Sequence, residues 1–384
     1  MKMDILIAVP GLPFNGETFP KQSLGGSESA GYYMARALGR LGHRVQLFCN
    51  TPERQSDGDV DYLPLALFRQ VADCAAHDVC VVQRAPELYT TQCRAKLSVL
   101  WCHDLASVRG ADAVRGTAWN YDKIFLLSQF MLEQYRSVYG LPDSMLHVTR
   151  NGVDLDLVAR VKAEASGEAR NPLSLFYSAR PERGLDVLLS EVMPRILRYE
   201  PKARLFLAEY ANPVPELAEF YAHCNALATA LGPNVVKLGN LTKEHLYRAY
   251  HAAGVYVYPT PSPFSPEFEE ISCISAMEAQ ACGLPSVTTA RGALPETVAP
   301  GAGRLVVEPV NSPAYYDAFA EGVLALLRSP EAWRAASAAG LARAQDLSWD
   351  AVAKDWTELF EREIRAQNSN MATLANHFWR RSDI

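Results

Sequence analysis

The chain has 384 residues, of which 49% are hydrophobic, 21% are charged and 10% are aromatic. This length and composition predict a globular protein of two or three domains, each with enough apolar material for its own core. The formal net charge of −6 argues against the broad basic surface that nucleic acid requires, so we expect no nucleic-acid partner. A local basic pocket is still compatible with this charge, because net charge does not report clustering.

The cysteine pattern and the hydropathy predict a cytoplasmic location. None of the eight cysteines forms a Cys-x-x-Cys pair or lies at zinc-ligand spacing from a histidine. Most of them lie in apolar runs, as free cysteines do in reducing compartments. The apolar run that ends at Pro10 is too short for a signal peptide, and no stretch reaches the roughly 18 apolar residues of a membrane span. Peripheral contact with a membrane stays open.

The first 160 residues alternate strand and helix signals. The apolar run Ile5–Val9 predicts a buried strand, and Ser27–Leu41 has apolar residues at helical spacing before a stop at Gly42. A second helix is expected over Gln129–Tyr139, ending at Gly140. Further short β-rich runs lie at Val45–Cys49, Val79–Val82, Ser98–Trp101 and Ile124–Leu127. The alternation predicts βαβ units and a parallel sheet, hence a first Rossmann-like domain over residues 1–160.

The same alternation restarts after a linker rich in Ala, Glu, Lys and Ser at Val158–Asn171. It predicts a second Rossmann-like domain over residues 171–348, and C-terminal helices over 349–384 that cross back to the first domain. The expected strands are Leu173–Tyr177, Ala203–Ala208, Val235–Leu238, Val255–Tyr258 and Ser286–Thr289, and the expected helices include Asp186–Arg198, Glu216–Leu231, Lys243–Ala253 and Ser272–Cys282. The fold class is therefore α/β, with two doubly wound parallel sheets facing a deep cleft in which ligands bind beyond the carboxyl ends of the strands.

The most informative segment carries two glutamates, Glu270 and Glu278, around the start of a predicted helix. Ser272 is a good N-cap, while Gly283 and Pro285 end the helix. A helix start offers free N–H groups and a positive dipole end, so it suits a phosphate. A diphosphate there would have one carboxylate on each flank, with hydrogen bonds to a ribose on one side and a hexose on the other. Taken alone, two glutamates at this spacing occur more often by chance than as part of a functional site.

In this context the segment resembles the signature of the retaining GT-B glycosyltransferases of the group 1 family, also called glycosyltransferase family four. Glu270 and Glu278 match the two glutamates of that signature, and Gly283 and Pro285 match its Gly-x-Pro. The Pro-Phe-Gly that usually follows the first glutamate is replaced here by Ile-Ser-Cys. The resemblance implies a GT-B fold whose first domain faces an acceptor and whose second domain binds a nucleoside-diphosphate sugar.

The resemblance extends to loops along most of the chain. Leu24-Gly-Gly-Ser-Glu28 resembles the family's glycine loop, and Ser178-Ala-Arg-Pro-Glu-Arg-Gly184 resembles its loop with two cations, with arginine in place of the usual lysine. His103 follows a predicted strand, as the family's catalytic-region histidine does. When isolated, each of these signals also has a purely structural explanation. The glycine loop is explained by a helix-start turn, the arginine loop by a surface loop with exposed arginines, and His103 by a core histidine.

The family pattern implies a role for each matching residue. His103 and Glu270 would contact the donor hexose as catalytic residues, Glu278 would bind the ribose, and Gly239 with Leu241 would hold the nucleobase. The diphosphate would be bound by Gly25, Gly26, Arg180, Arg183, and the N–H groups near Cys273 and Ile274. We expect no cofactor and no metal, because these cations and amides would stabilise the leaving diphosphate.

Other functional classes fit the sequence less well. A dehydrogenase requires Gly-x-Gly-x-x-Gly after the first strand, where this chain has Pro10-Gly-Leu-Pro-Phe14. The Asp-x-Asp metal motif of GT-A enzymes occurs at Asp57-Gly-Asp59, Asp59-Val-Asp61 and Asp154-Leu-Asp156, and we interpret all three segments as solvated turns. A GT-B sugar-nucleotide epimerase or a non-catalytic sugar-nucleotide-binding protein remains as an alternative. The preferred hypothesis is metal-independent transfer of a hexosyl unit from a UDP- or GDP-sugar, with retention, to an unknown acceptor that is a saccharide, a lipid-linked compound or a small molecule.

Overall fold

The computed structural model describes residues 1–88, 94–106, 111–167, 169–209 and 214–379. Its first domain is built on a sheet with the strand order β3-β4-β2-β1-β5-β6-β7-β8, parallel throughout except between β3 and β4. The strands are β1 (Asp4–Val9), β2 (Arg44–Cys49), β3 (Gln55–Ser56), β4 (Val60–Pro64), β5 (His77–Gln83), β6 (Ala95–Trp101), β7 (Lys123–Leu126) and β8 (Leu146–Val148). The central strands are buried along almost their whole length, as in a parallel sheet that is covered on both faces.

The helices of the first domain are α1 (Gly26–Arg40), α2 (Phe68–Cys74), α3 (Ala111–Thr117) and α4 (Gln129–Tyr139). The predicted helix over Gln129–Tyr139 is confirmed at both ends. Ser128 caps its first turn by accepting the N–H of Met131, and Gly140 ends it in the left-handed conformation at φ 62°.

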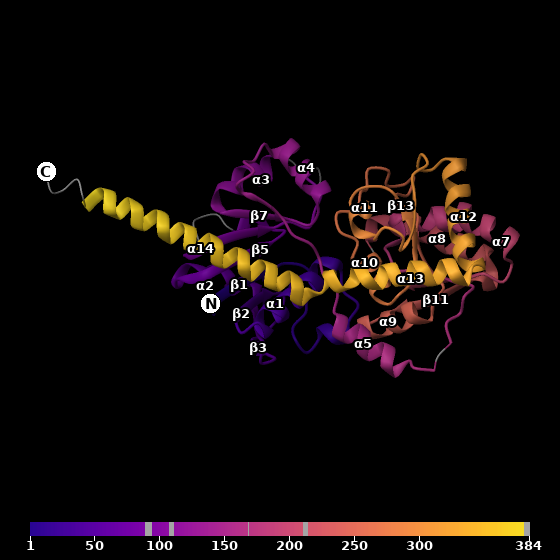
Figure 1. The fold of residues 1–384 in the computed structure, drawn as a ribbon, viewed down its shortest axis with the longest axis horizontal. Coiled ribbons are helices and arrows are strands. Elements are labelled where there is room, and N and C mark those ends of the chain that lie inside the picture. The colour runs from indigo at the N-terminus through magenta and orange to yellow at the C-terminus, as the bar shows by residue number, and fades with distance from the viewer. Residues whose placement is uncertain (89–93, 107–110, 168, 210–213, 380–384) are drawn as a thin grey trace.

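The second domain has a fully parallel sheet with the order β11-β10-β9-β12-β13-β14. Its strands are β9 (Ser174–Tyr177), β10 (Arg204–Glu209), β11 (Val235–Asn240), β12 (Val255–Tyr258), β13 (Ser286–Thr289) and β14 (Gly303–Val306). Its helices are α5 (Leu155–Glu164), α6 (Leu185–Val187), α7 (Met193–Tyr199), α8 (Ala218–Ala230), α9 (Lys243–Ala252), α10 (Ile274–Ala281), α11 (Leu294–Thr297), α12 (Pro313–Arg328) and α13 (Pro330–Ala344), and α14 (Trp349–Trp379) follows. The two expected doubly wound sheets are therefore present, side by side in Figure 1.

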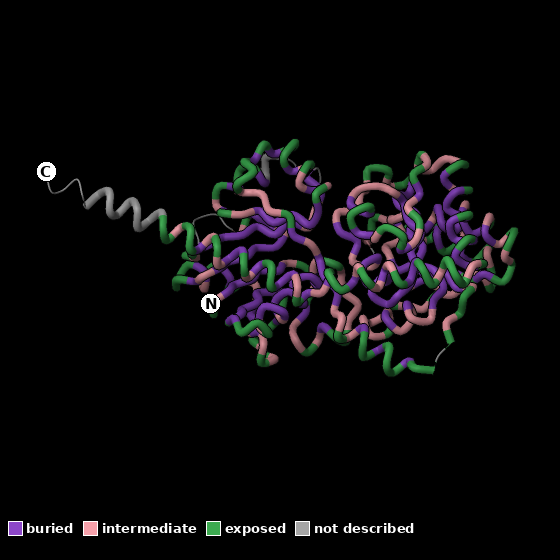
Figure 2. The backbone as a smooth tube through the Cα atoms, viewed as in Figure 1, coloured by how far each residue is buried: buried purple, intermediate pink, exposed green. Residues whose placement is uncertain are grey.

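Each sheet has its own hydrophobic core. The start of α5 departs from the chain division expected from the sequence, whereas α14 crosses back to the first domain as expected. Val158 and Val161 of α5 pack in the second core, although the first domain was expected to extend to residue 160. Trp349 to Ile364 of α14 contribute to the first core, and α14 runs along that domain (Figure 1). Figure 2 shows the buried residues gathered along the two sheets and the exposed ones on outer helix faces.

The two connections between the domains run side by side. Val153 forms a parallel β-bridge with Ser348, its N–H donates to Leu347 O at 2.7 Å, and its carbonyl accepts from Trp349 N at 3.2 Å. A side chain at Gly152 would meet the Trp349 backbone within 2.9 Å. Because the two connections are hydrogen-bonded to each other, a rotation of one domain relative to the other has to move both connections.

On the other side, the domains touch through the start of α4. The two carboxylate oxygens of Glu296, in α11, accept the N–H groups of Gln129 and Phe130, each at 2.7 Å. Gln134 in α4 donates to Glu269 at 3.2 Å, and Ile271 packs against the first core. The structure is therefore a closed arrangement in which a carboxylate of one domain caps a helix of the other.

Replacing Glu296 by alanine is expected to favour an opened arrangement. The substitution removes both bonds to the α4 amides, and loss of a helix N-terminal acceptor costs about 0.5–2 kcal/mol. Small-angle scattering should therefore give a larger mean radius of gyration for Glu296→Ala than for the unmodified protein. Glu321→Ala, at an exposed site in α12, is the matched control and should leave the profile unchanged. Superimposable profiles for Glu296→Ala and the control would show that this contact does not hold the domains together.

Candidate functional site

A cavity of about 600 Å³ lies between the two domains. It is lined by loops that follow β1, β5, β6, β7 and β8 of the first domain and β9 and β12 of the second. It therefore lies beyond the carboxyl ends of both sheets, where ligands of open α/β sheets bind.

The structure brings most of the site residues expected from the sequence into this cavity. Those that line it are Gly25, Gly26, His103, Arg180, Arg183, Glu270, Cys273 and Ile274. Glu278 and Leu241 line a smaller adjoining cavity of about 50 Å³. Gly239 is not among the residues that line either cavity, and it lies in β11 with φ at 69°, where the pairing with β10 shifts its register.

The start of α10 faces the larger cavity, but it differs from the expected start. The helix runs over Ile274–Ala281 with Cys273 as the N-cap, two residues later than the predicted start at Ser272. Ser272 is buried, and its hydroxyl makes no hydrogen bond to any described residue, so the prediction that it caps the helix was wrong. The start of α1 lies opposite, since a side chain at Gly26 would approach Ile274 Cδ1 to 3.5 Å. Free amides at two helix starts give this part of the cavity a positive potential.

Arg183 lies in the cavity with part of its guanidinium unpaired. The group stacks on Phe268 at 3.3 Å from the ring centre, and its Nη1 is buried without a hydrogen-bond partner among the described residues. The next residue, Gly184, has φ at 107°, and a Cβ there would come within 1.9 Å of Pro259 O. The turn is therefore pressed against the end of β12, which fixes where Arg183 projects. An unpaired buried cation of this kind suits an anionic group.

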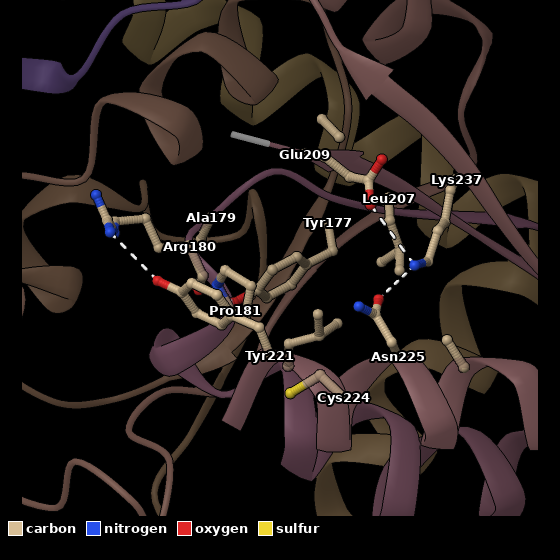
Figure 3. Close-up of a pocket in the computed structure, with 13 residues that line it drawn as sticks. Tyr177, Ala179, Arg180, Pro181, Leu207, Glu209, Tyr221, Cys224, Asn225 and Lys237 are labelled. Carbon is tan, nitrogen blue, oxygen red and sulfur yellow. Dashed lines mark hydrogen bonds and ion pairs between the residues drawn. The ribbon is translucent and has the colours of Figure 1, made fainter. Parts of the chain in front are cut away.

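Arg180 separates the larger cavity from a third cavity, of about 170 Å³, inside the second domain. Its Nε donates to Glu182 at 2.6 Å and its Nη2 to the Tyr221 hydroxyl at 3.3 Å; the second contact is drawn in Figure 3. The same hydroxyl donates to Glu182 at 3.1 Å. Glu182 thus balances part of the Arg180 charge, so Arg183 is the stronger candidate for binding a diphosphate.

Hydrogen bonds fix both the side chain and the backbone of Glu270. Its carboxylate accepts a hydrogen bond from the Tyr258 hydroxyl at 2.6 Å, and its carbonyl accepts from Ala293 N at 2.7 Å. Gly292, at φ 58°, packs so closely that a Cβ would lie 2.5 Å from that carbonyl oxygen. Burial raises the pKa of Glu270, against the opposing effects of Arg183 and the Tyr258 hydrogen bond.

His103 is a neutral base within the cavity. Its Nε2 lies 2.9 Å from the Gln83 side-chain nitrogen, which also donates to Ser27 O at 2.9 Å. Burial, together with the nearby Arg84 charge, lowers the pKa of His103 to about 3. With Nε2 accepting from Gln83, the imidazole carries its proton on Nδ1 and is available as a donor through that atom.

Four charged residues among those described in the cavity received no role in the sequence analysis: Glu28, Arg84, Asp104 and Glu269. Arg84 follows β5 with φ at 64°, and its guanidinium makes a two-fold contact with Asp104 at 3.0 and 2.8 Å. Glu28 is 5% exposed and accepts from Leu12 N and the Ser27 hydroxyl, both at 3.0 Å. Arg84 lies two residues after the predicted strand Val79–Val82, and this was the available signal, because positions just beyond such strands lie at the ligand-binding edge.

Glu278 is oriented by two residues of α9. Its Oε1 is paired with the Lys243 ammonium and accepts from the Tyr247 hydroxyl at 2.9 Å. Both partners were predicted to lie in a helix, but no local signal linked them to Glu278. Lys243 compensates the charge of a carboxylate that is only 2% exposed, so Glu278 is kept in place beside the smaller cavity.

The Asp-x-Asp motifs have other partners. Asp57 and Asp59 pair with Arg36, Asp61 pairs with Arg54, and Asp154 caps α5 by accepting from Leu157 N at 3.0 Å. None of them lines the large cavity. Over the described ranges, no three or more His, Cys, Asp or Glu side chains are grouped as metal ligands.

The part of the chain that the structure describes contains no helix with the length and apolar character needed to span a membrane.

Comparison with known proteins finds similarity to glycosyltransferases over part of the chain. Residues 172–329 match the model of the family described as glycosyl transferases group 1. The chain is 27% identical over 263 residues to a GDP-mannose-dependent monoacylated alpha-(1-6)-phosphatidylinositol monomannoside mannosyltransferase of Corynebacterium glutamicum, covering 66% of this chain and 65% of that protein. It is 32% identical over 228 residues to a D-inositol 3-phosphate glycosyltransferase of Frankia alni, covering 56% and 53%. The chain thus spans less than two thirds of either relative.

Solved structures similar to this one extend over almost the whole chain. Sucrose-phosphate synthase from Thermosynechococcus elongatus matches with a TM-score of 0.74 at 19% identity, covering 95% of this chain and all of that one. Anabaena HepE in complex with UDP and glucose matches with a TM-score of 0.67 at 14% identity, covering 94% and 100%. At these identities the similarity establishes the architecture, two facing parallel-sheet domains of the GT-B type.

Proposed function

We propose that this chain, which has the GT-B fold and matches the group 1 glycosyltransferases over residues 172–329, transfers a hexosyl unit from a nucleoside-diphosphate sugar to an acceptor hydroxyl. The observation that carries this proposal is the arrangement in the large cavity. Arg183 and the first amides of α10 form its positive side, and Glu270 lies next to them. A diphosphate and the attached sugar need these two environments side by side.

In the proposed reaction the bond from the anomeric carbon to the diphosphate breaks, and a bond to the acceptor oxygen forms. Arg180, Arg183 and the amides of Ile274 and Ser275 stabilise the charge that grows on the leaving phosphate oxygen. That oxygen takes the acceptor proton, so no protein base and no metal ion are required. Retention at the anomeric carbon is proposed from the family resemblance.

Each remaining residue is proposed to contact one part of the donor. Glu278, fixed by Lys243 and Tyr247, binds the ribose, and the base lies towards Leu241 in the smaller cavity. Glu270 accepts hydrogen bonds from hexose hydroxyls. His103, neutral and protonated on Nδ1, donates to the same sugar. We propose a UDP- or GDP-sugar as the donor and the cytoplasm as the location.

A thermal-shift series with UDP, GDP, ADP and their sugars tests this function. We expect one nucleoside diphosphate to raise the melting temperature, and the matching sugar nucleotide to be slowly hydrolysed without an acceptor. Addition of EDTA should leave both results unchanged. If no nucleoside diphosphate stabilises the protein, the assignment fails. If EDTA abolishes hydrolysis and manganese restores it, the metal-independent mechanism fails.

The experiment also separates the two alternatives. A sugar-nucleotide epimerase would produce a second sugar nucleotide rather than free sugar, and a non-catalytic binding protein would be stabilised but would release no sugar. Both outcomes are visible when the products are separated by anion-exchange chromatography. We expect free sugar and nucleoside diphosphate only.

The raised pKa of Glu270 predicts the acid limb of the pH profile. Burial disfavours its charged form, so the carboxylate takes up a proton at a higher pH than the ordinary value of 4.5. If the carboxylate is the form that binds the sugar, kcat/KM is high above the raised pKa and falls as pH decreases through it. His103 adds no limb in this range because its pKa is lowered to about 3. A profile of donor hydrolysis that stays flat down to pH 4.5 would contradict the assignment.

A further inference from the structure

The first-domain side of the large cavity contains an ion pair that the proposed chemistry does not use. Arg84 and Asp104 follow neighbouring strands, β5 and β6, and both line the cavity. The guanidinium donates through Nε and Nη2 to the two oxygens of Asp104, and through Nη1 to the Ser27 hydroxyl at 3.3 Å. The backbone of Arg84 is also unusual, because its φ is 64°. This conformation is uncommon for a residue other than glycine and costs about 1 kcal/mol or more.

Several contacts hold this pair in place. Asp104 is anchored through its carbonyl, which accepts from the Tyr135 hydroxyl at 3.1 Å. The side chains of Arg84 and Asp104 are 34% and 13% exposed, so the pair is accessible from the cavity without being free in solvent. A rigid donor and acceptor pair on the surface of a cavity can bind hydroxyl groups of a ligand by replacing water.

The charges on this side of the cavity restrict what can enter it. Among the described lining residues of the first domain, Glu28 and Asp104 are acidic and Arg84 is basic, while His103 is neutral. The net charge of these lining residues is therefore negative. The second domain adds Glu270 and also Glu269, which is paired with Arg291 at 3.3 Å. Its two lining arginines lie where the donor diphosphate is proposed to bind. A bound diphosphate would use that positive charge, so a second anion would meet the carboxylates of Glu28 and Glu270.

We propose that the acceptor is a neutral polyhydroxylated compound, and that Arg84 and Asp104 bind two of its hydroxyl groups. This inference rests on the proposed function, because it places the acceptor opposite the donor sugar. Asp104 accepts a hydrogen bond from one hydroxyl and Arg84 donates to another. An acceptor with a phosphate at this end is rejected by the carboxylate of Glu28, since the charges of Arg84 and Asp104 balance each other and leave no net positive charge for the phosphate.

Matched pairs of acceptors test the proposal. With the donor found by the nucleotide series, the probes are glucose, mannose and myo-inositol, each compared with its monophosphate. Binding is measured by ligand-observed NMR in the presence of the nucleoside diphosphate, and turnover by release of that diphosphate above the hydrolysis background. We expect the neutral compounds to bind, and the preferred one to exceed its phosphate in kcat/KM by at least about tenfold. Equal or stronger use of a phosphate, or no binding by any neutral probe, overturns the proposal.

Two variants show whether the ion pair sets this preference. Asp104→Asn removes one negative charge and leaves the Arg84 charge unbalanced, so the preference for the neutral compound should fall by about tenfold or more. Arg84→Met should raise KM for the neutral acceptor with a smaller effect on kcat. Asp57→Asn is the matched control, because Asp57 is also paired with an arginine but lies outside the cavity. An unchanged preference in folded Asp104→Asn overturns the assignment of this pair.

The outcomes distinguish this inference from the proposed function. Absence of nucleoside diphosphate binding in the unmodified protein would refute the glycosyltransferase assignment itself. Nucleotide binding and donor hydrolysis, together with a preference for phosphorylated acceptors, would refute only the acceptor class. Should Asp104→Asn fail to fold, Arg84→Met supplies the test, because an unchanged KM for the neutral acceptor in that variant counts against the pair.

Discussion

Replacing Arg183 by methionine is expected to lower kcat/KM for sugar transfer by about 10²–10³-fold, the usual cost of removing one preorganised charge contact. Methionine retains an apolar side chain that can pack against Phe268, so the fold should be preserved while the positive charge is lost. The effect should appear mainly in kcat, because Arg183 stabilises charge that develops as the diphosphate leaves. Steady-state kinetics of donor hydrolysis and of transfer measure it.

Arg195→Met is the matched control for this prediction. Arg195 also forms ion pairs, to Glu191 and Asp317, but it lies in α7 and does not line the large cavity. The control should keep activity within a few-fold of the unmodified protein, and both variants should keep its melting temperature. A folded Arg183→Met variant with unmodified kcat/KM would remove Arg183 from the donor site.

Replacing Trp356 by alanine is expected to destabilise the first domain by about 3–5 kcal/mol. Trp356 lies in α14 and is fully buried, with ring centres at 4.8 Å from Trp101 and 4.9 Å from Phe125. Its indole N–H donates to the Thr149 hydroxyl at 2.7 Å, so the substitution also leaves a buried acceptor without its donor. The loss should loosen α14 from the sheet, because this ring is in the centre of their contact.

Urea unfolding followed by circular dichroism measures the destabilisation, with separate transitions fitted if the domains unfold independently. Trp119→Ala is the control, because Trp119 is 73% exposed and the same side chain is removed. That control should change the free energy of unfolding by no more than about 0.5 kcal/mol. A small effect of Trp356→Ala would mean that α14 contributes little to the first core.

The contact that keeps the two domains closed and the donor site are connected through one loop. Glu269 contacts α4 of the first domain through Gln134, while the next residue, Glu270, faces the cavity. Ile271 then packs against the first core. Binding of a sugar at Glu270 would therefore act on the same loop that joins the domains, which is a physical route from donor binding to closure.

Local sequence patterns determined the two sheets of this protein. Continuous apolar runs such as Ile5–Val9 and Val255–Tyr258 become central strands because parallel strands are buried on both faces. The helix over Gln129–Tyr139 follows from a capping serine and a terminal glycine that act within one turn. The alternation of these elements was sufficient to indicate where the strands end, and so which loops line a cavity.

The tertiary structure decided which side chains meet at that edge. Arg84 and Asp104, Glu278 and Lys243, and Glu296 with the start of α4 are pairs that come from distant segments. No local pattern links such partners, because their distance depends on strand order, domain orientation and the direction of each side chain. Burial then sets the charge states, as for His103 and Glu270, through a desolvation that exists only in the folded protein.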